Sequence, residues 1–230
     1  MLQIWGNCLM QTGRKDRAVE VFGEAMALAP DDPKVLTLMS NIHFSTGEFE
    51  KALDVMNHII AVSPASRFAY LMQALCLYRL RRDREAFDAV NRALGFLGGD
   101  LTVYILKMQI LLRNGAYEEV HEILDFLAEA DAPEDLSVEF IKAQLQEVEQ
   151  NDTNAAFTRY QAIARKIEEG DNILDPADLY YRMAMVMRES MNEANENDRQ
   201  ILLDQVEKGL KLDAYHVDSL RYKAWLLKTG

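Results

Sequence analysis

The sequence predicts an all-α fold, a solenoid of about six antiparallel helix pairs followed by one terminal helix. The first observation is a period of 34 residues that holds over four consecutive units without a gap. The second is that several positions of the unit recur together, in a first helix, a turn, a second helix and a stop. Helical repeats of this kind contact only their neighbours, which overrides the domain count that length alone suggests. We therefore expect one elongated domain over residues 1–230.

The columns of the unit can be read directly from the chain. They are Leu2, Leu36, Tyr70, Tyr104 and Val138 in the first helix; Gly13, Gly47, Arg81 and Gly115 in the turn; Ala18, Ala52, Ala86 and Val120 early in the second helix; Phe22, Met56, Val90 and Leu124, then Ala25, Ile59, Ala93 and Leu127 further along it; and Pro30, Pro64, Gly98 and Ala132 at the stop.

This pattern of a small residue, a large apolar residue four positions later and a terminal proline resembles the tetratricopeptide repeat family, whose unit is a helix–turn–helix. The resemblance is close over residues 1–132 and looser beyond them. It implies a right-handed superhelix (an α–α superhelix) whose concave face is lined by the first helix of each pair. It also implies that partners bind in this groove as extended peptides or helices.

The first four repeats are expected at roughly residues 1–32, 33–66, 67–100 and 101–134. Asp32 followed by Pro33 is a helix start, because a capping side chain precedes a proline at the first helical position. Gly47 suits the residue after a helix end, where a positive φ is often required. Arg81 replaces this glycine in repeat three, so its turn should differ locally. The predicted helices are Met1 to Thr12, Arg17 to Ala29, Pro33 to Ser45, Arg67 to Leu80 and Leu101 to Asn114.

The later repeats, 135–175 and 176–216, carry insertions and are followed by the terminal helix of 217–230. Val138 to Ala156 spans 18 residues where Leu36 to Ala52 spans 16, which places about two extra residues near 151–153. A second insertion, of about seven residues, precedes Leu202, and the polar stretch 193–198 is expected to be a loop or a frayed helical extension. The remaining predicted helices are Ala177 to Asn192, Arg199 to Leu212 and Val217 to Lys228, which makes thirteen helices in all. Since the chain begins inside a helix and ends where a turn should open, we expect it to be part of a longer protein.

Composition excludes several classes of protein. The formal charge of −12 argues against a general nucleic-acid binder, and no stretch approaches the roughly 18 apolar residues of a membrane span. The first residues lack the features of a secretory signal, so the expected location is cytoplasmic. Residues 1–115 carry 13 basic and 12 acidic side chains, whereas residues 116–230 carry 12 and 25. This acidic excess indicates either a solvated outer face or an attraction for a basic partner.

The cysteines and histidines suggest no chemistry. Cys8 and Cys76 occupy the same helix position two repeats apart, which is too far for a disulfide, so both should be free thiols. The four histidines lie in different repeats, without further ligands at metal-binding spacing. No phosphate-binding loop, nucleophile elbow or Ser/His/Asp set can be found. We therefore predict a protein that is not an enzyme and has neither metal nor cofactor.

The groove that the family resemblance implies can be assigned by repeat position. The predicted partner-binding residues are Asn7, Asn41, Phe44, Phe68, Leu71, Met72, Leu75, Tyr78, Arg79, Ile105, Leu106, Gln109, Arg113, Tyr180 and Tyr181. Asn7 and Asn41 hold equivalent places, where they would hydrogen-bond a peptide backbone or bridge helices through water. Some family members grip a peptide's terminal carboxylate from three first helices. Asn7 fits that clamp, but its other positions hold Gln3, Leu38, Phe68 and Met72, which puts a clamp in doubt.

The helix Arg67 to Leu80 is apolar almost all round, whereas a solenoid helix needs apolar residues only where it faces its neighbours. Either its extra apolar residues are covered by the chain itself, or they form an exposed strip in the groove, as interaction sites often do. The cluster Arg79, Arg81, Arg82 and Arg84 at the end of this helix is either a solvated turn or a contact for an acidic partner segment.

Two functions remain open. The first is a scaffold or adaptor that binds a peptide or helix of a partner protein in the concave groove. The second is a regulatory or targeting segment of a larger enzyme or signalling protein whose catalytic domain is absent. Self-association of the chain through its terminal helices, which would give a homo-oligomer, is a third reading. No nucleic-acid or membrane partner is expected.

Overall fold

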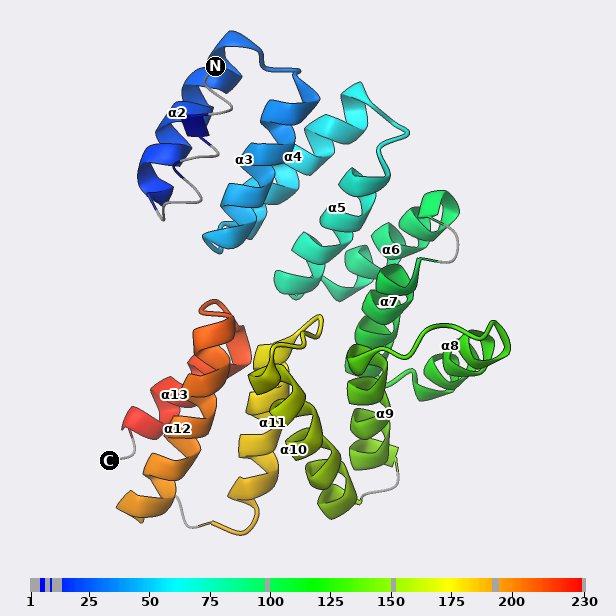
Figure 1. Cartoon of the computed structure of the whole chain (residues 1–230), viewed down its shortest axis with the longest axis vertical. Helices are drawn as coiled ribbons and strands as arrows, with labels where there is room; N and C mark the ends of the chain where they lie inside the picture. The colour runs from blue at the N-terminus through cyan, green and yellow to red at the C-terminus, as the bar shows by residue number, and fades with distance from the viewer. Residues whose placement is uncertain are drawn as a thin grey trace. The chain divides into compact units, whose positions relative to one another are not determined.

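The computed structural model describes residues 5–6, 9, 14–97, 100–149, 152–191 and 195–228 (Figure 1). In these residues every regular element is an α-helix, and consecutive helices pack against each other from α2 to α6 and from α9 to α13, which confirms the predicted fold class. The helices are α2 (Lys15–Leu28), α3 (Pro33–Ser45), α4 (Phe49–Val62), α5 (Arg67–Arg79), α6 (Asp83–Leu97), α7 (Leu101–Arg113), α8 (Tyr117–Glu129), α9 (Leu136–Glu149), α10 (Thr153–Glu169), α11 (Pro176–Arg188), α12 (Glu196–Leu212) and α13 (Val217–Lys228). None of them is long and apolar enough to cross a membrane.

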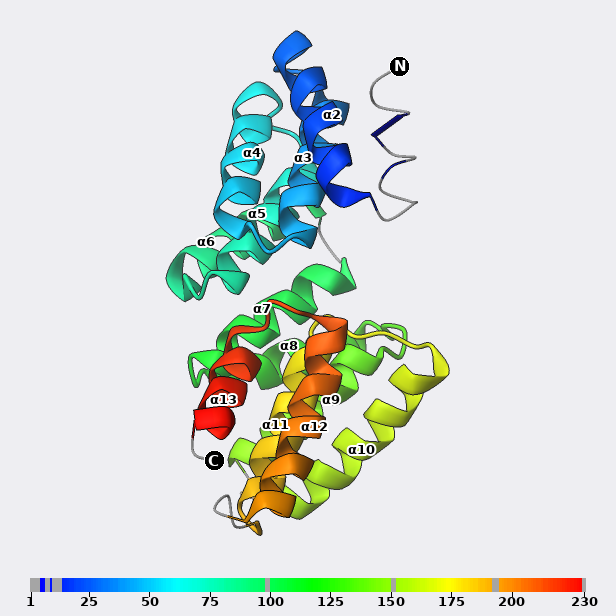
Figure 2. The same ribbon diagram turned by 90° about the vertical axis from the view of Figure 1, so that its left-hand side faces the viewer.

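The chain divides into two compact units, unit 1 (Met1–Ile110) and unit 2 (Leu111–Gly230). In unit 1, α3 and α4 lie side by side and α5 follows α4 (Figure 1, Figure 2). In unit 2, α11 contacts both α10 and α12. The first predicted helix, Met1 to Thr12, lies almost wholly outside the described residues, as does Cys8. Cys76 is a free, buried thiol, as predicted.

The repeat columns form the core of unit 1. Ala18, Ala52 and Ala86, the small residues early in the second helices, are fully buried. The large apolar column follows the same rule, since Phe22 and Met56 have no exposed surface. Burying such side chains stabilises the fold by about 1.5–3 kcal/mol each. The period therefore marks where each helix packs.

The turn of repeat three does not differ locally, which corrects the sequence prediction. Arg81 has φ 60°, close to 75° at Gly47 and 73° at Gly115. Its N–H donates to the carbonyl of Tyr78 at 3.2 Å, as that of Gly47 donates to Phe44 at 3.1 Å. The shared hydrogen bonds close the preceding helix in each repeat. Arg81 thus accepts a left-handed backbone that costs an L-residue about 1–2 kcal/mol.

The insertions of unit 2 lie partly elsewhere than predicted. Helix α9 ends 11 residues after Val138 (149 − 138), whereas α3 ends nine residues after Leu36 (45 − 36), so the two extra residues lie in α9 and not near 151–153. The connection 130–135 is also longer than 29–32, six residues against four. Of the seven residues inserted before Leu202, four lengthen the α11–α12 connection, which has seven residues (189–195) against three in 46–48, and the other three lie in α12. Residues 196–198, predicted as a loop or a frayed helical extension, are helical, and the side chain of Asn195 caps α12 by accepting from the N–H groups of Asn197 and Asp198.

A polar network joins three helices of unit 2. The hydroxyl of Tyr160 on α10 donates to Glu147 on α9, which also pairs with Arg182 of α11 at 3.3 Å. Arg182 donates to Asp178 at 2.9 Å, and Asp178 accepts from the buried amide of Gln144 at 2.9 Å. Burial raises the pKa of Tyr160, which keeps the phenol neutral and able to donate. This network fixes how α9, α10 and α11 pack.

Candidate partner-binding surface

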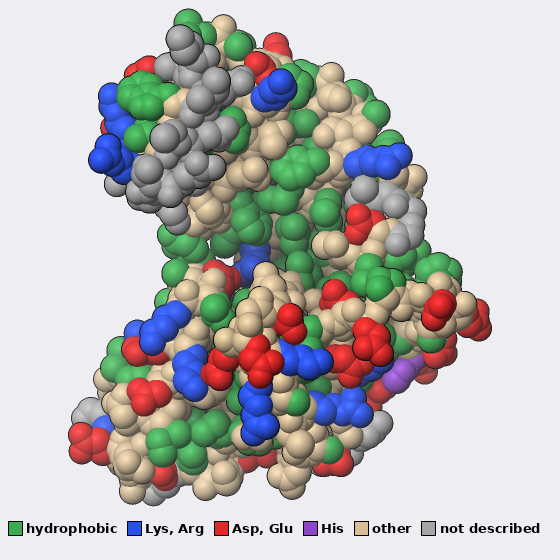
Figure 3. All heavy atoms as spheres, in the orientation of Figure 1, with side chains coloured by type: hydrophobic (Ala, Val, Ile, Leu, Met, Phe, Trp, Pro, Cys, Tyr) green, Lys and Arg blue, Asp and Glu red, His purple; other side chains and the backbone are tan. Residues whose placement is uncertain are grey.

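Helix α5 presents two different faces. On one side Ala69, Ala74, Cys76 and Leu77 are buried at 4% exposure or less. On the other side are four apolar residues that the core does not enclose: Phe68, Leu71, Met72 and Leu75. Phe68 is 38% exposed and the other three are half-buried. In the space-filling view, hydrophobic side chains gather over this part of unit 1 (Figure 3).

The neighbouring helix α3 adds polar and aromatic groups. Asn41 is exposed, and its amide makes no hydrogen bond with any residue that the structure describes. Phe44 is half-buried, with its ring centroid 5.2 Å from that of Phe49 in an edge-to-face arrangement. The guanidinium of Arg79 at the end of α5 lies 6.0 Å from the Phe44 ring centroid. This cation–π contact joins α3 to α5. We call Asn41, Phe44, Phe68, Leu71, Met72, Leu75 and Arg79 the α3–α5 surface.

Met72 shows how this surface rests on the core. It packs against a buried cluster formed by Leu36 of α3, Met56 and Ile59 of α4, and Ala69 of α5. Residues of three helices thus support Met72 from beneath the surface. An apolar patch on a rigid support binds a partner with little loss of protein entropy.

The other predicted binding residues offer little area. Tyr78, Ile105, Leu106, Gln109 and Tyr180 are all at 7% exposure or less.

Tyr181 and Arg113 are half-buried, and Tyr181 packs near Tyr222 and His216 at ring distances of 6.3 and 6.0 Å. Asn7 lies outside the described residues. The sequence identified these positions by repeat spacing alone, which does not report how much each side chain is covered.

The basic cluster is only partly available to a partner. Arg82 forms ion pairs with Glu85 at 2.6 Å and with Glu50 at 3.4 Å. These contacts raise the pKa of Arg82 and lower that of Glu85, since each charge stabilises the other. Arg81 and Arg84 are exposed. Arg79 and Arg82 therefore serve contacts within the chain.

A metal site finds no support in the described part of the chain, where no three His, Cys, Asp or Glu side chains gather as potential ligands. His58 and His121 each contact a single carboxylate instead, Asp31 and Glu149, at 2.7 Å.

Successive helix pairs of this geometry define a helical-repeat protein. A sequence model described as tetratricopeptide repeat matches residues 7–75, the part of the chain where the columns are most regular. The resemblance that the sequence indicated is therefore supported by this match over residues 7–75. No curated protein matches the sequence.

Solved structures show the same fold. A tetratricopeptide repeat protein from Parabacteroides merdae is similar over 99% of this chain and 82% of its own, at 16% identity and a TM-score of 0.72. MamA from Desulfovibrio magneticus is similar over 56% of this chain and 73% of its own, at 19% identity and a TM-score of 0.53. MamA of AMB-1 is similar over 60% and 75%, at 22% identity and a TM-score of 0.52. At these identities the likeness concerns the fold alone.

Proposed function

We propose that this protein is an interaction scaffold whose α3–α5 surface binds an apolar peptide or an amphipathic helix of a partner protein. The observation that carries the proposal is the outer side of α5, where Phe68, Leu71, Met72 and Leu75 keep part of their surface in contact with water. Contiguous apolar residues of this kind usually mark an interaction site. Asn41 supports the proposal because its free amide can hydrogen-bond a peptide backbone.

The chemistry of the surface fits a short apolar segment. Phe68 and Leu75 offer aromatic and aliphatic area on one helix, and the ring of Phe44, which contacts Arg79, adds aromatic area from α3. Helix-in-groove recognition places apolar side chains of the partner, three or four positions apart, against such a strip. A few buried aromatic and arginine anchors supply most of the affinity in interfaces of this type.

A paired variant tests the proposal. Phe68→Ser with Leu75→Ser removes apolar area from the α3–α5 surface. Leu28→Ser with Val62→Ser is the matched control, because Leu28 and Val62 are exposed apolar residues of α2 and α4 outside that surface, at 78% and 44% exposure. The wild type and both variants would serve as baits for affinity capture from the source lysate, with partners identified by mass spectrometry.

The expected result is a protein captured by the wild type and by the control but lost with the surface variant. The loss should correspond to about 2 kcal/mol or more of binding free energy. A urea melt of each variant accompanies the capture, and the surface variant should lose only about 1–2 kcal/mol of stability because its side chains are half-buried or more exposed. Equal capture by all three proteins would refute the α3–α5 surface as the binding site.

A further inference from the structure

A hollow of about 260 Å³ lies in unit 2, where α11 packs against both α10 and α12. Its floor is made by Ala164, Tyr180 and Met183, which are exposed by only 7%, 3% and 7%. Phe157 and Met187, both half-buried, add apolar area to its lining. We call this site the α10–α12 cleft. It has the size and the lining to receive an apolar side chain.

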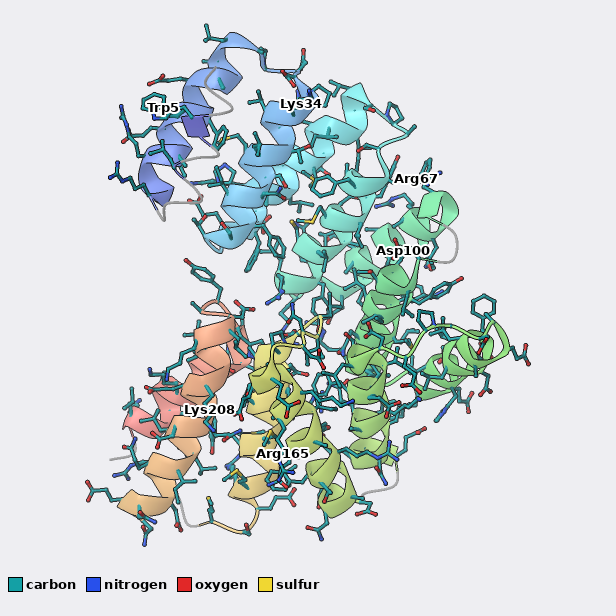
Figure 4. All side chains as sticks on the ribbon, in the orientation of Figure 1. Trp5, Lys34, Arg67, Asp100, Arg165 and Lys208 are labelled. Atoms are coloured by element: carbon teal, nitrogen blue, oxygen red, sulfur yellow. The ribbon has the colours of Figure 1, made fainter. Side chains whose placement is uncertain are left out.

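Two cations line the same cleft from different helices, Arg165 from α10 and Lys208 from α12 (Figure 4). Both side chains are exposed, and neither forms an ion pair or a hydrogen bond with a described residue. Residues 116–230 contain 25 acidic and 12 basic side chains, so partners of opposite charge are abundant. Lys142 and Lys223, for example, are paired with Glu139 and Glu207. Arg165 and Lys208 remain unneutralised in an acidic half of the chain.

The rest of the lining is polar. Glu168 also lines the cleft, and burial, together with the charge of Glu168, raises the pKa of Tyr180. Its carboxylate can accept a hydrogen bond from a peptide N–H. Gln205 donates to the sulfur of Met183 at 3.5 Å, which fixes one side of the floor. With Arg165 and Lys208 against Glu168, the charged groups of the cleft sum to +1.

In the corresponding cleft of unit 1, polar and charged side chains are bonded to one another. This cleft is formed by α4, α5 and α6, and its volume is also about 260 Å³. There Gln73 donates to Asn57 at 2.7 Å and accepts from Arg92 at 3.2 Å, while Arg82 pairs with Glu85 at 2.6 Å.

Lys208 stands in α12 where Arg92 stands in α6, and Met183 and Met187 of α11 line this cleft where Gln73 and Leu77 of α5 line that of unit 1. The hydrogen bond that occupies Arg92 in unit 1 is therefore not offered to Lys208 by α11, which presents an apolar floor instead.

We infer that the α10–α12 cleft binds an acidic peptide segment of a partner protein, in which an apolar side chain lies between carboxylates. The apolar side chain would enter over Met183 and Met187, and the carboxylates would pair with Arg165 and Lys208. The acidic surface elsewhere in this half repels such a segment, which restricts binding to the cleft. This site goes beyond the proposed function, because it lies in the other unit and selects a ligand by charge.

The capped peptide acetyl-Glu-Glu-Leu-Glu-Glu-amide is the probe. Full-length protein labelled with ¹³C at its methionine methyl groups reports binding by NMR, and the methyl signals of Met183 and Met187 should shift in a saturable way while that of Met72 in unit 1 stays in place. Arg165→Gln and Lys208→Gln should each weaken binding about tenfold, the scale of one charge-assisted contact.

Matched controls separate a site from general attraction between charges. Lys166→Gln on α10 and Lys211→Gln on α12 remove exposed cations that do not line the cleft, so they should leave the affinity unchanged. Peptides with glutamine for glutamate, or serine for leucine, should bind at least about tenfold more weakly.

The inference is overturned if the signals of Met183 and Met187 do not shift, if the two control variants weaken binding as much as the cleft variants, or if either altered peptide binds as well as the probe. Phe68→Ser should leave probe binding intact, so failure of this site and failure of the α3–α5 surface are distinguishable.

Discussion

Replacing Arg81 with glycine should stabilise this protein. Arg81 has φ 60° in the turn between α5 and α6, the conformation that Gly47 provides in the preceding repeat at 75°. A left-handed conformation costs an L-residue about 1–2 kcal/mol, whereas glycine adopts it freely. Glycine also loses more backbone entropy on folding, which offsets about 0.5–1 kcal/mol of this gain in stability. The net expected gain for Arg81→Gly is about 0.5–1 kcal/mol.

Two further variants isolate the backbone effect. Arg81→Ala keeps the left-handed strain but removes the side chain, so the difference between Arg81→Gly and Arg81→Ala should be about 1 kcal/mol in favour of glycine. Gly47→Ala introduces the same strain where it is absent and should destabilise by about 1 kcal/mol.

Urea titrations followed by circular dichroism, with the denaturant slope compared between variants, measure these differences. In a thermal melt, each kcal/mol corresponds to about 2–4 °C for a chain of this size. If Arg81→Gly proves less stable than Arg81→Ala, the turn is not under backbone strain and the reasoning fails.

Three other predictions concern the core. Cys76 is fully buried, and that burial raises its pKa to about 12. In a variant whose other cysteine is replaced by serine, a thiol reagent at pH 8 should therefore modify Cys76 only as fast as the protein opens. Stoichiometric labelling of the native protein within minutes would contradict this prediction. Tyr160→Phe should cost about 1–3 kcal/mol in a urea melt, because a carboxylate of α9 loses its buried donor; an unchanged melt would show that the hydrogen bond contributes nothing. Gly209→Ala should be less stable than Gly95→Ala by about 1–3 kcal/mol. A Cβ at Gly209 would lie 3.1 Å from the carbonyl oxygen of Ala177, whereas a Cβ at Gly95 would meet nothing within 4 Å. Equal stabilities of the two variants would mean that α11 can move away from α12.

The repeat columns predicted the fold because they are the residues that pack. Ala52 and Met56 recur at the fixed spacing since each must fit between two neighbouring helices, and both are fully buried. Helix starts were predicted where a capping side chain precedes proline, and Asp32 does accept from the N–H of Lys34 at 2.8 Å. Local chemistry and long-range packing agree at these positions, which is why a single sequence was sufficient to predict the fold.

The turn of repeat three was mispredicted for a physical reason. The turn was expected to differ because Arg81 stands where the other repeats have glycine. The hydrogen bonds that close α5, from Arg81 to Tyr78 and from Arg82 to Leu77, are instead set by the two helices that must meet there. Packing of two helices outweighs a local cost of about 1–2 kcal/mol. The identity of the turn residue alone therefore does not predict the backbone conformation of this turn.

The candidate surface was only partly visible in the sequence for a different reason. Repeat spacing placed Leu75 and Ile105 in the same groove, yet Leu75 is half-buried and Ile105 is 4% exposed. Exposure depends on the tilt and the length of neighbouring elements, and spacing does not encode either.

The α10–α12 cleft was missed for the same reason, because Arg165 and Lys208 are far apart in the chain and belong to two second helices, where the family resemblance predicts no ligand. A sequence signal did exist: Lys208 and Arg92 hold the same place in their repeats, but Arg92 donates to Gln73 across its cleft, whereas Met183 and Met187 line the cleft beside Lys208. A charge that keeps its repeat position while losing its internal partner is free to bind another molecule. Comparing repeats for such lost partners therefore locates candidate sites that the groove positions alone do not reveal.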